Sequence, residues 1–150
     1  MLITNAELNN LQEILKLQYL AYQSEAQLHN NFNIQPLMET LEELTIEYEN
    51  GILLKAIDDN DTIIGSIRGY IDNNTLLIGK LMVNPKHQGK GIGSQLLLAI
   101  EQMYPEFRYE LFTSEKSTRN LHFYETRGYR RFMEKLVTPE LKLIYLEKNT

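Results

Sequence analysis

The spacing of apolar residues predicts two amphipathic helices in the first third of the chain. After a short apolar start at residues 2–3, Thr4-x-x-Glu7 has the composition of a capping box that opens the first helix. A polar stretch at 27–35 ends this pattern, and Pro36 suits the first turn of a second helix. Apolar residues three or four apart share one face of each helix: Leu8, Leu11, Leu15, Tyr19 and Tyr22 in the first, and Leu37, Leu41, Leu44 and Tyr48 in the second. The opposite face of the second helix is acidic, with Glu39, Glu42, Glu43 and Glu47.

From residue 51 the pattern changes to short apolar runs that are typical of strands. Runs at 52–57, 62–71 and 75–83 are separated by Asp- and Asn-rich turns and predict an antiparallel meander. A glycine-rich turn after Pro85 opens a helix that stops near Pro105. The remaining elements are a strand at 107–113, a helix from 117 to a left-handed Gly128, and strands at 129–137 and 141–147. This order predicts one α+β domain over residues 1–150, with no repeat or linker to divide it.

Composition narrows the chemistry. The 150 residues contain 15 Lys and Arg against 20 Asp and Glu, for a net charge of −5, and contain no cysteine. A disulfide framework, a thiolate metal site and a cysteine nucleophile are therefore excluded, and the three scattered histidines lack the spacing of metal ligands. The acidic balance argues against binding to a nucleic-acid backbone and favours a cationic small substrate. The N-terminus lacks the features of a signal peptide and no apolar run approaches roughly 18 residues, so we expect a cytoplasmic protein without a membrane span.

Residues 83–94 carry the strongest chemical signal. They end a strand and begin a helix, with alternating glycines at 89, 91 and 93. The first amides of a helix have no internal partners and carry the positive end of the helix dipole, so such a turn can bind a diphosphate, and Lys90 adds a charge. A Walker loop is excluded because Gly91 follows Lys90, and the last glycine interval does not fit a dinucleotide fingerprint. Taken alone, the glycines are also compatible with a tightly packed turn that binds nothing.

Two segments together resemble a known family. Gln88-x-x-Gly91-x-Gly93, preceded by Leu81-Met82-Val83-x-Pro85, resembles the acetyl-CoA pyrophosphate motif of the GNAT superfamily of N-acetyltransferases. The segment 120–129, which contains Asn120, Tyr124 and Gly128, resembles a later motif of the same superfamily. The two segments follow each other in the expected order, and the predicted order of elements is similar to that fold from end to end.

The resemblance implies a GNAT-like fold, with a central splayed mixed sheet of about seven strands flanked by about four helices. The strand that ends at Val83 and the strand that starts at Phe107 would part to admit the pantetheine arm of acetyl-CoA. The implied cofactor contacts are the backbone of Leu81, Met82 and Val83 to the pantetheine amides, the backbone amides of Gln88, Gly89, Lys90, Gly91, Ile92, Gly93 and Ser94 to the pyrophosphate, and Asn120.

Acetyl transfer from a thioester to an amine needs two proton transfers. An amine with a pKa of about 10.4 is neutral in only about one molecule in 2,500 at pH 7, so a base or a water relay is useful. The leaving thiolate needs a proton, and the resemblance implies that Tyr124 donates it; otherwise Tyr124 is an aromatic core residue. Because the chain has no cysteine, we expect direct attack in a ternary complex, with the carbonyl polarised by a backbone N–H near Met82 or Val83.

The general base is where the sequence departs from the superfamily pattern. Many relatives carry a carboxylate on the strand before the glycine turn, but residues 76–82 have none. We prefer Glu110 on the following strand, although a solvated strand face explains it equally well. Glu43 and Glu47 could instead attract a cationic amine, or belong to a solvated helix face, or water could be the only relay. Weaker candidates for an acceptor or phosphate contact are Arg68, Tyr70 and Arg119.

The sequence therefore predicts an N-acetyltransferase that uses acetyl-CoA, without a metal, to acetylate a primary amine of a small molecule or a protein. A non-catalytic module that binds CoA for regulation is the main alternative, and a structural domain that ignores CoA is the other. The acceptor is not specified by these motifs. The terminal strands are compatible with a homodimer.

Overall fold

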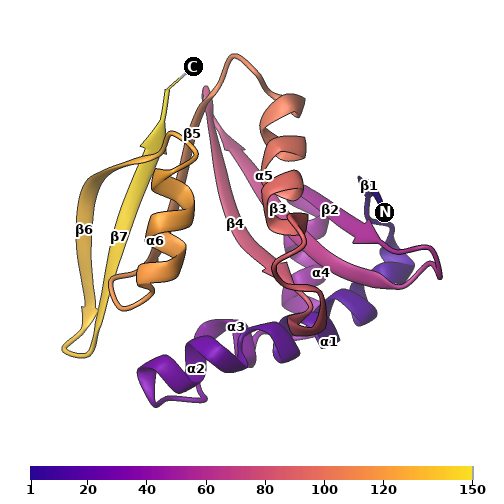
Figure 1. The fold of residues 1–150 in the computed structure, drawn as a ribbon, viewed down its shortest axis with the longest axis horizontal. Helices are drawn as coiled ribbons and strands as arrows, with labels where there is room; N and C mark the ends of the chain where they lie inside the picture. The colour runs from indigo at the N-terminus through magenta and orange to yellow at the C-terminus, as the bar shows by residue number, and fades with distance from the viewer. Residues whose placement is uncertain (150) are drawn as a thin grey trace.

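A computed structural model, which describes residues 1–149, contains a seven-stranded mixed sheet with strand order β1-β2-β3-β4-β5-β7-β6 (Figure 1). All neighbours are antiparallel except β4 and β5, which are parallel. The predicted α+β class, the meander and the mixed sheet are confirmed. The strands are β1 (Leu2–Asn5), β2 (Ile52–Ile57), β3 (Ile63–Asp72), β4 (Thr75–Val83), β5 (Arg108–Ser114), β6 (Arg130–Thr138) and β7 (Leu141–Lys148).

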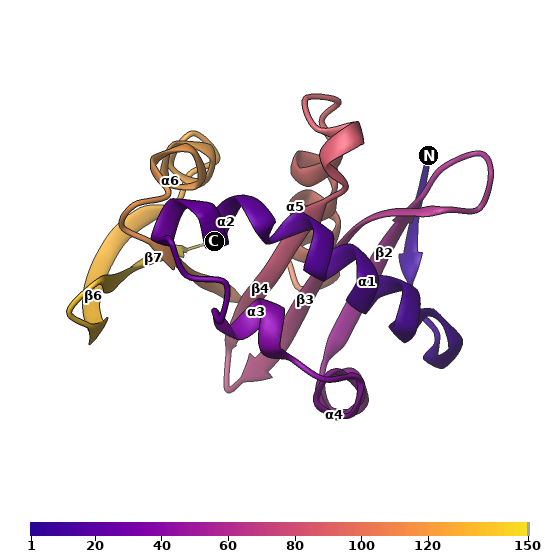
Figure 2. The same ribbon diagram turned by 90° about the horizontal axis from the view of Figure 1, so that it is seen from below.

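Helices cover both faces of the sheet. The α-helices are α1 (Leu11–Ala21), α2 (Gln23–His29), α3 (Gln35–Met38), α4 (Leu41–Asn50), α5 (Ile92–Met103) and α6 (Thr118–Glu125), with short 3-10 turns η1 (Leu8–Asn10) and η2 (Pro85–His87). Helices α5 and α6 lie on one face and α4 on the other, while α1 and α2 run across one end (Figure 2). Among residues 1–149, no helix combines the length and the apolar character that crossing a bilayer requires.

Two apolar clusters hold these layers together. The larger one lies between the sheet and α5, where Ile67, Leu76, Leu96 and Ile100 are fully buried. The smaller one lies between the sheet and helices α1 and α4, and includes Leu44. The central strand β3 is buried on both faces, which explains why its sequence shows no polar alternation.

The first predicted helix boundary is wrong. Thr4 belongs to β1, where it pairs with Lys55 of β2, so it cannot cap a helix. The reciprocal cap is formed one turn later by Glu7 and Asn10 at η1. The helix also breaks at Tyr22, whose φ of −87° and ψ of 5° interrupt it, so that α2 occupies the start of the stretch predicted as polar loop.

The second predicted helix is also divided. Glu39 adopts an extended conformation, with φ of −60° and ψ of 133°, and ends α3. Thr40 then caps α4 by accepting a hydrogen bond from the amide of Glu43, whose carboxylate accepts from the amide of Thr40. The interruption turns Glu39 inward, where it is only 2% exposed, so the prediction that it belongs to an exposed acidic face is wrong.

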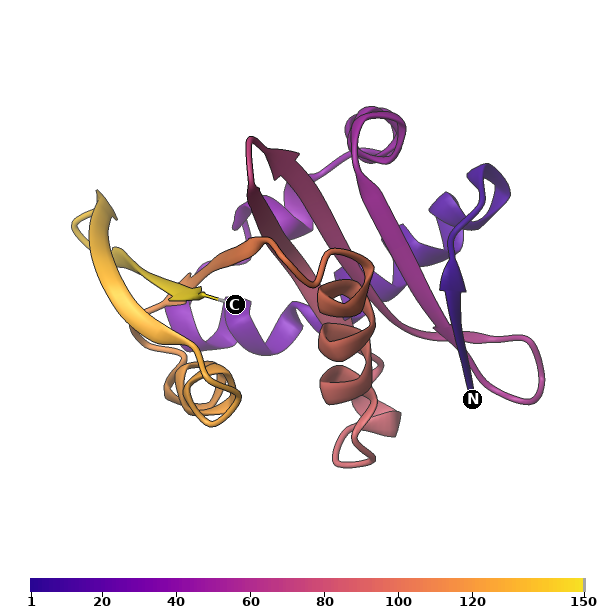
Figure 3. The same ribbon diagram turned by 90° about the horizontal axis from the view of Figure 1, so that it is seen from above.

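The sheet opens between β4 and β5. Only three residue pairs join these strands, from Thr75 and Arg108 to Leu77 and Glu110. Beyond Leu77 the strands diverge, and a bulge at 80–81 adds twist to β4, with Lys80 in the left-handed region at φ of 50°. Seen from above, β5, β7 and β6 turn away from β1–β4 (Figure 3). The splayed sheet expected from the resemblance is thus present.

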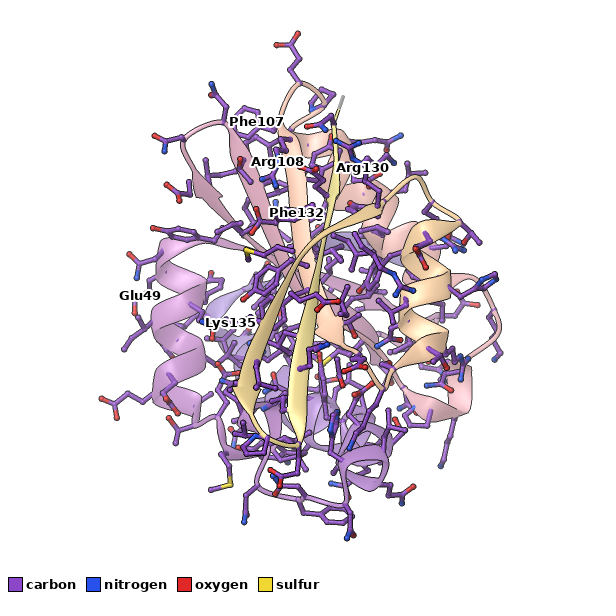
Figure 4. The ribbon with its side chains drawn as sticks, turned by 90° about the vertical axis from the view of Figure 1, so that its left-hand side faces the viewer. Glu49, Phe107, Arg108, Arg130, Phe132 and Lys135 are labelled. Carbon is purple, nitrogen blue, oxygen red and sulfur yellow. The ribbon has the colours of Figure 1, made fainter. Side chains whose placement is uncertain are left out.

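Strand β6 forms one edge of the sheet and is exposed along its whole length. It presents apolar side chains such as Phe132, which lies beside Arg108 on the face shown in Figure 4. A second copy could extend the sheet at this edge. The homodimer remains a prediction.

The buried contact between α5 and the sheet gives a stability prediction. Leu96→Ala should lower the free energy of unfolding by about 2–5 kcal/mol, because it leaves a cavity in the larger apolar cluster. Leu98→Ala, on the same helix but 52% exposed, should cost less than about 1 kcal/mol. Urea denaturation followed by circular dichroism measures both. Equal costs would show that α5 does not pack as described.

Candidate active site

A cavity of about 1260 Å³ occupies the opening between the two halves of the sheet. Its walls come from helices α2–α4 and the residues that connect them, from strands β2, β3, β4 and β5, and from the hairpin of β6 and β7. The chemically active side chains on these walls include Tyr22, Glu25, Glu47, Arg68, Lys80 and Tyr124. The cavity therefore brings together residues from both ends of the chain.

The glycine turn at the start of α5 displays free backbone donors. Gly89 and Gly91 have φ values of 80° and 79°, a left-handed conformation that glycine adopts without strain. Within residues 1–149, no amide from 88 to 94 donates a hydrogen bond to another protein group. Amides at a helix N-terminus attract anions, so the predicted pyrophosphate residues form a coherent anion-binding turn.

Two cationic side chains flank this turn. Lys90 is exposed, and its Nζ lies 3.5 Å from Nδ1 of His87. Arg127, at the end of α6, reaches across to the first turn of α5, where its Nε donates to Oγ of Ser94 at 3.2 Å. Its guanidinium lies 3.8 Å from the centre of the Phe123 ring. Arg127 was not predicted from the sequence, because its place beside Ser94 depends on how the end of α6 lies against α5.

The open edge of β4 supplies further backbone groups. Met82 and Val83 pair with Ser66 and Gly65 of β3, but no strand within the described residues 1–149 pairs with their other side. Leu81 lines the cavity, whereas the Met82 side chain is buried in the smaller apolar cluster. An extended ligand with amides can therefore pair with this edge as a strand would.

Tyr124 lies on α6 and lines the cavity. Its ring packs edge-to-face against Phe123 and Tyr129, while its hydroxyl bonds to no group of residues 1–149. Burial raises its pKa, and Tyr22 and Glu25 raise it further, so the phenol is protonated at neutral pH. A protonated phenol that faces a cavity can donate a proton or a hydrogen bond there.

Asn120 lies one turn before Tyr124 and connects α6 to two other elements. Its Nδ2 is 3.3 Å from Oγ1 of Thr113 on β5 and 3.4 Å from Oε1 of Glu25 on α2. Ser117 also donates to that Glu25 oxygen, at 3.0 Å. These bonds fix the N-terminal helices against the β5 half of the sheet and place Asn120 in the cavity wall.

Glu110 lies elsewhere. It is on β5 where that strand still pairs with β4, and it is absent from the cavity wall. Its Oε1 accepts a hydrogen bond of 2.7 Å from Arg108, which also donates to Glu147. The structure therefore does not bring Glu110 together with Tyr124, because the closed end of the sheet directs its carboxylate to an ion pair.

A buried network crosses the acceptor side of the cavity. Nη1 of Arg68 donates to Glu39 at 2.8 Å and to Glu47 at 2.9 Å, and Nη2 donates to Gln18. Gln18 in turn donates to Glu39 at 2.9 Å. Arg68, a weaker candidate for an acceptor contact in the sequence, is only 6% exposed and lies on the cavity wall. An arginine in the middle of the apolar run of β3 is the signal that could have revealed it.

The two carboxylates of this network titrate in opposite directions. Burial raises the pKa of Glu39, but hydrogen bonds that involve Glu47, Arg68 and Gln18 outweigh it and lower that pKa to about 2. Burial and the neighbouring Glu39 raise the pKa of Glu47, although Arg68 and Lys80 oppose this. Burial and Arg68 lower the pKa of Lys80. Two carboxylates on one guanidinium thus have different protonation behaviour.

Of the weaker candidates, Tyr70 lines the cavity, whereas Arg119 is exposed outside it. His87 lies beside the glycine turn, and His122 is exposed on α6. Within residues 1–149, no three His, Asp or Glu side chains are grouped so that they could hold a metal ion.

Comparison with known proteins identifies the family. The sequence profile described as "Acetyltransferase (GNAT) family" matches residues 9–129. The chain belongs to the GNAT family of acetyltransferases. No curated protein shows a significant match to the sequence. The predicted resemblance and the prediction of an acetyltransferase are confirmed.

Solved structures similar to this GNAT acetyltransferase share its fold at low sequence identity. The PaiA N-acetyltransferase of Thermoplasma acidophilum, in complex with coenzyme A, has a TM-score of 0.82 at 17% identity, with 99% of this chain and 98% of that chain covered. The ribosomal-protein-S18-alanine N-acetyltransferase of Escherichia coli has 0.80 at 12%, with 98% and 92% covered. An aminoglycoside 6'-N-acetyltransferase complexed with coenzyme A has 0.78 at 17%, with 99% and 96% covered. The fold is therefore that of the family over nearly the whole chain.

The depressed pKa of Glu39 predicts how stability depends on pH in this GNAT acetyltransferase. A carboxylate whose folded pKa lies below 4.5 contributes stability above that pH and loses it as the pH falls towards 2. Glu39→Gln should therefore lower the free energy of unfolding by about 3–5 kcal/mol at pH 7. Its deficit relative to the unmodified protein should shrink between pH 5 and pH 2.

Urea titrations at several pH values measure this deficit. Glu42→Gln, at an exposed position of α4, is the matched control and should show little change at any pH. A Glu39→Gln deficit that is the same at pH 3 and pH 7 would contradict the assignment of Glu39 as a strongly acidic buried carboxylate.

Proposed function

We propose that this GNAT acetyltransferase transfers the acetyl group of acetyl-CoA to a primary amine by direct attack in a ternary complex. The observation that carries the proposal is the row of unpaired amides at 88–94, next to the open edge of β4 and to the cavity that contains Tyr124. Acetyl-CoA has a part that fits each of these features. Its diphosphate fits the backbone donors, its amide-bearing arm fits the strand edge, and its thioester sulfur fits the protonated phenol.

We retain the contacts to acetyl-CoA that the sequence resemblance implies. The amides from Gln88 to Ser94 hold the pyrophosphate, and Lys90 adds positive charge beside it. The backbone of 81–83 pairs with the pantetheine amides, and Asn120 contacts the cofactor from α6. Arg127 also lies beside this turn, bonded to Ser94, and contributes a second cation near the phosphates.

The chemistry then follows from the groups around the thioester. Acetyl-CoA supplies an acetyl carbon that the neutral amine attacks and a sulfur that leaves. A backbone N–H near Met82 or Val83 polarises the carbonyl oxygen, as an oxyanion hole does. Tyr124 donates its proton to the departing thiolate, which its raised pKa permits because the phenol is protonated at working pH. Glu110 takes no step in this scheme.

The acceptor is a small molecule or a protein that presents a primary amine. Carboxylates on the cavity wall, Glu25, Glu47 and Glu140, support a cationic acceptor. The names of the similar structures include an aminoglycoside 6'-N-acetyltransferase and a ribosomal-protein-S18-alanine N-acetyltransferase, so both classes of amine belong in a screen. Nucleic acid and membrane are not expected partners, and the cytoplasm stays the predicted location.

Calorimetry with acetyl-CoA tests the cofactor site. Gly91→Ala should weaken binding by about tenfold or more, because a Cβ at the helix start strains the left-handed turn and moves amides away from the phosphates. Gly128→Ala is the matched control, since φ of 93° imposes similar strain after α6 and outside the turn. It should lower stability and leave the affinity for acetyl-CoA unchanged. No heat with the unmodified protein would refute the proposed function.

Release of CoA thiol tests the role of Tyr124, with kanamycin, spermidine and a peptide that begins with alanine as acceptors. Tyr124→Phe should lower kcat by about 10²-fold or more and leave acetyl-CoA affinity within about twofold. Tyr104→Phe, which alters a tyrosine outside the cavity, is the control. If the unmodified protein binds acetyl-CoA but acetylates no amine in a broad panel, the regulatory binding module becomes the better account.

A further inference from the structure

The last turn of α4 places one carboxylate at the acceptor side of the cavity. Glu47 lines the wall, and its side chain is 42% exposed. Arg68 donates to its Oε2 at 2.9 Å, while its Oε1 accepts no hydrogen bond from residues 1–149. One oxygen is therefore held in position and the other is free to accept a proton or a hydrogen bond from a molecule in the cavity.

Glu39 shows by contrast what a purely structural carboxylate looks like here. It bonds to the same Nη1 of Arg68, at 2.8 Å, but its side chain is only 1% exposed and it does not reach the cavity wall. Gln18 donates to it as well. Pairs of carboxylates whose surroundings separate their pKa values are the arrangement that assigns different proton roles to similar groups. In this pair, Glu39 is the one that stays ionised.

The charges that face Glu47 come from every element packed around it. Arg68 approaches from β3 and Lys80 from β4, and both favour the carboxylate. Glu39 approaches from the turn before α4 and, together with burial, disfavours it. On α4 itself, Glu43 is engaged in the helix cap with Thr40. Burial and Glu39 outweigh the cations, so the pKa of Glu47 lies above its ordinary value and a proton is accepted closer to neutral pH.

We propose that Glu47 is the catalytic base that takes the proton of the acceptor amine, directly or through one water molecule, and that Arg68 and Glu39 are its positioning residues. This inference rests on the proposed function. The inference explains which group acts as the base, although β4 carries no carboxylate and Glu110 lies outside the cavity. The carboxylate is supplied from α4, which packs beside β2, and the guanidinium of Arg68 on β3 holds it in place.

The proton balance of the transfer is complete with these groups. The ammonium loses one proton to Glu47, and the lone pair of the neutral nitrogen forms the N–C bond. As the C–S bond breaks, the thiolate takes a proton from Tyr124, and the nitrogen passes its second proton through water to the Tyr124 phenolate. Tyr124 regains a proton and Glu47 releases its own to solvent, so each turnover yields the amide, CoA thiol and one free proton.

The pH dependence of kcat/KM separates this role from a structural one. With spermidine as acceptor, the unmodified protein should lose activity as the pH falls through the pKa of Glu47 and should reach a plateau above it. Glu47→Gln should lower kcat/KM by about 10²–10⁴-fold at pH 7. Its remaining activity should follow the neutral fraction of the amine, rising about tenfold per pH unit towards the amine pKa of about 10.

Glu49→Gln is the matched control. Glu49 lies on the same helix, is exposed and does not line the cavity (Figure 4). It should leave both kcat/KM and the pH profile unchanged. Kanamycin and the peptide that begins with alanine replace spermidine if they are better acceptors.

Acetyl-CoA calorimetry on Glu47→Gln distinguishes failure of the inference from failure of the proposed function. Glu47→Gln should bind acetyl-CoA as tightly as the unmodified protein. If the unmodified protein turns over and Glu47→Gln keeps its rate and its plateau, the inference is overturned and the proposed function stands. If the unmodified protein neither binds acetyl-CoA nor acetylates an amine, both fall together.

A titration without any acceptor provides a second measurement. Carbon NMR of the side-chain carboxyl groups, with Glu47→Gln used to assign the resonance, should show that Glu47 titrates above the ordinary value of 4.5. Glu39→Gln should lower the pKa of Glu47, because it removes the negative charge that raises it. A Glu47 that titrates at or below 4.5 in the unmodified protein would overturn the inference even if no tested amine is acetylated.

Discussion

The separation of β4 from β5 is the constraint on which the rest of the structure depends. Two parallel strands that pair for only three residues leave backbone groups of β4 without a strand partner. Buried backbone groups must find a hydrogen-bond partner, so this edge needs water or a ligand with amides. The unpaired amides at the start of α5 follow directly after this edge along the chain. One opening in the sheet therefore generates both the groove for an extended arm and the site for its anionic end.

The same opening has to be stabilised, because few sheet contacts cross it. Glu25 of α2 stabilises it on one side by accepting hydrogen bonds from Ser117 and Asn120, which belong to the other half of the molecule. Helices α1 and α2 thus run from one half of the sheet to the other (Figure 2). Helix α2, which bridges the opening, also forms part of the cavity wall on the acceptor side. The residues that hold the opening in shape and the residues that select the acceptor are therefore coupled.

Local signals made the strands and the cofactor turn predictable. The runs of β2 and β4 were located by their apolar residues and turns, and the alternating glycines at 89–93 identified the start of α5. The division at Glu39 was not predictable, because the partners that compensate an inward-facing carboxylate there lie far along the chain: Arg68 on β3 and Gln18 on α1. The position of Glu110 was not predictable for the same reason, since its orientation depends on Arg108 and on the register of β5 with β7.

The two sides of the cavity recognise their ligands in different ways, and this explains which residues could be predicted. The cofactor side is built mainly from backbone amides and strand edges, whose positions follow from the fold and require little beyond glycine in the sequence. The acceptor side is built from side chains of the N-terminal helices, which meet β3 and β4 only through long-range packing. Substitutions in α2–α4 can therefore change the amine that is accepted while the thioester carrier stays bound in the same way. This is why the family could be recognised from short motifs, whereas the acceptor has to be determined from the charges and shape of the opposite wall.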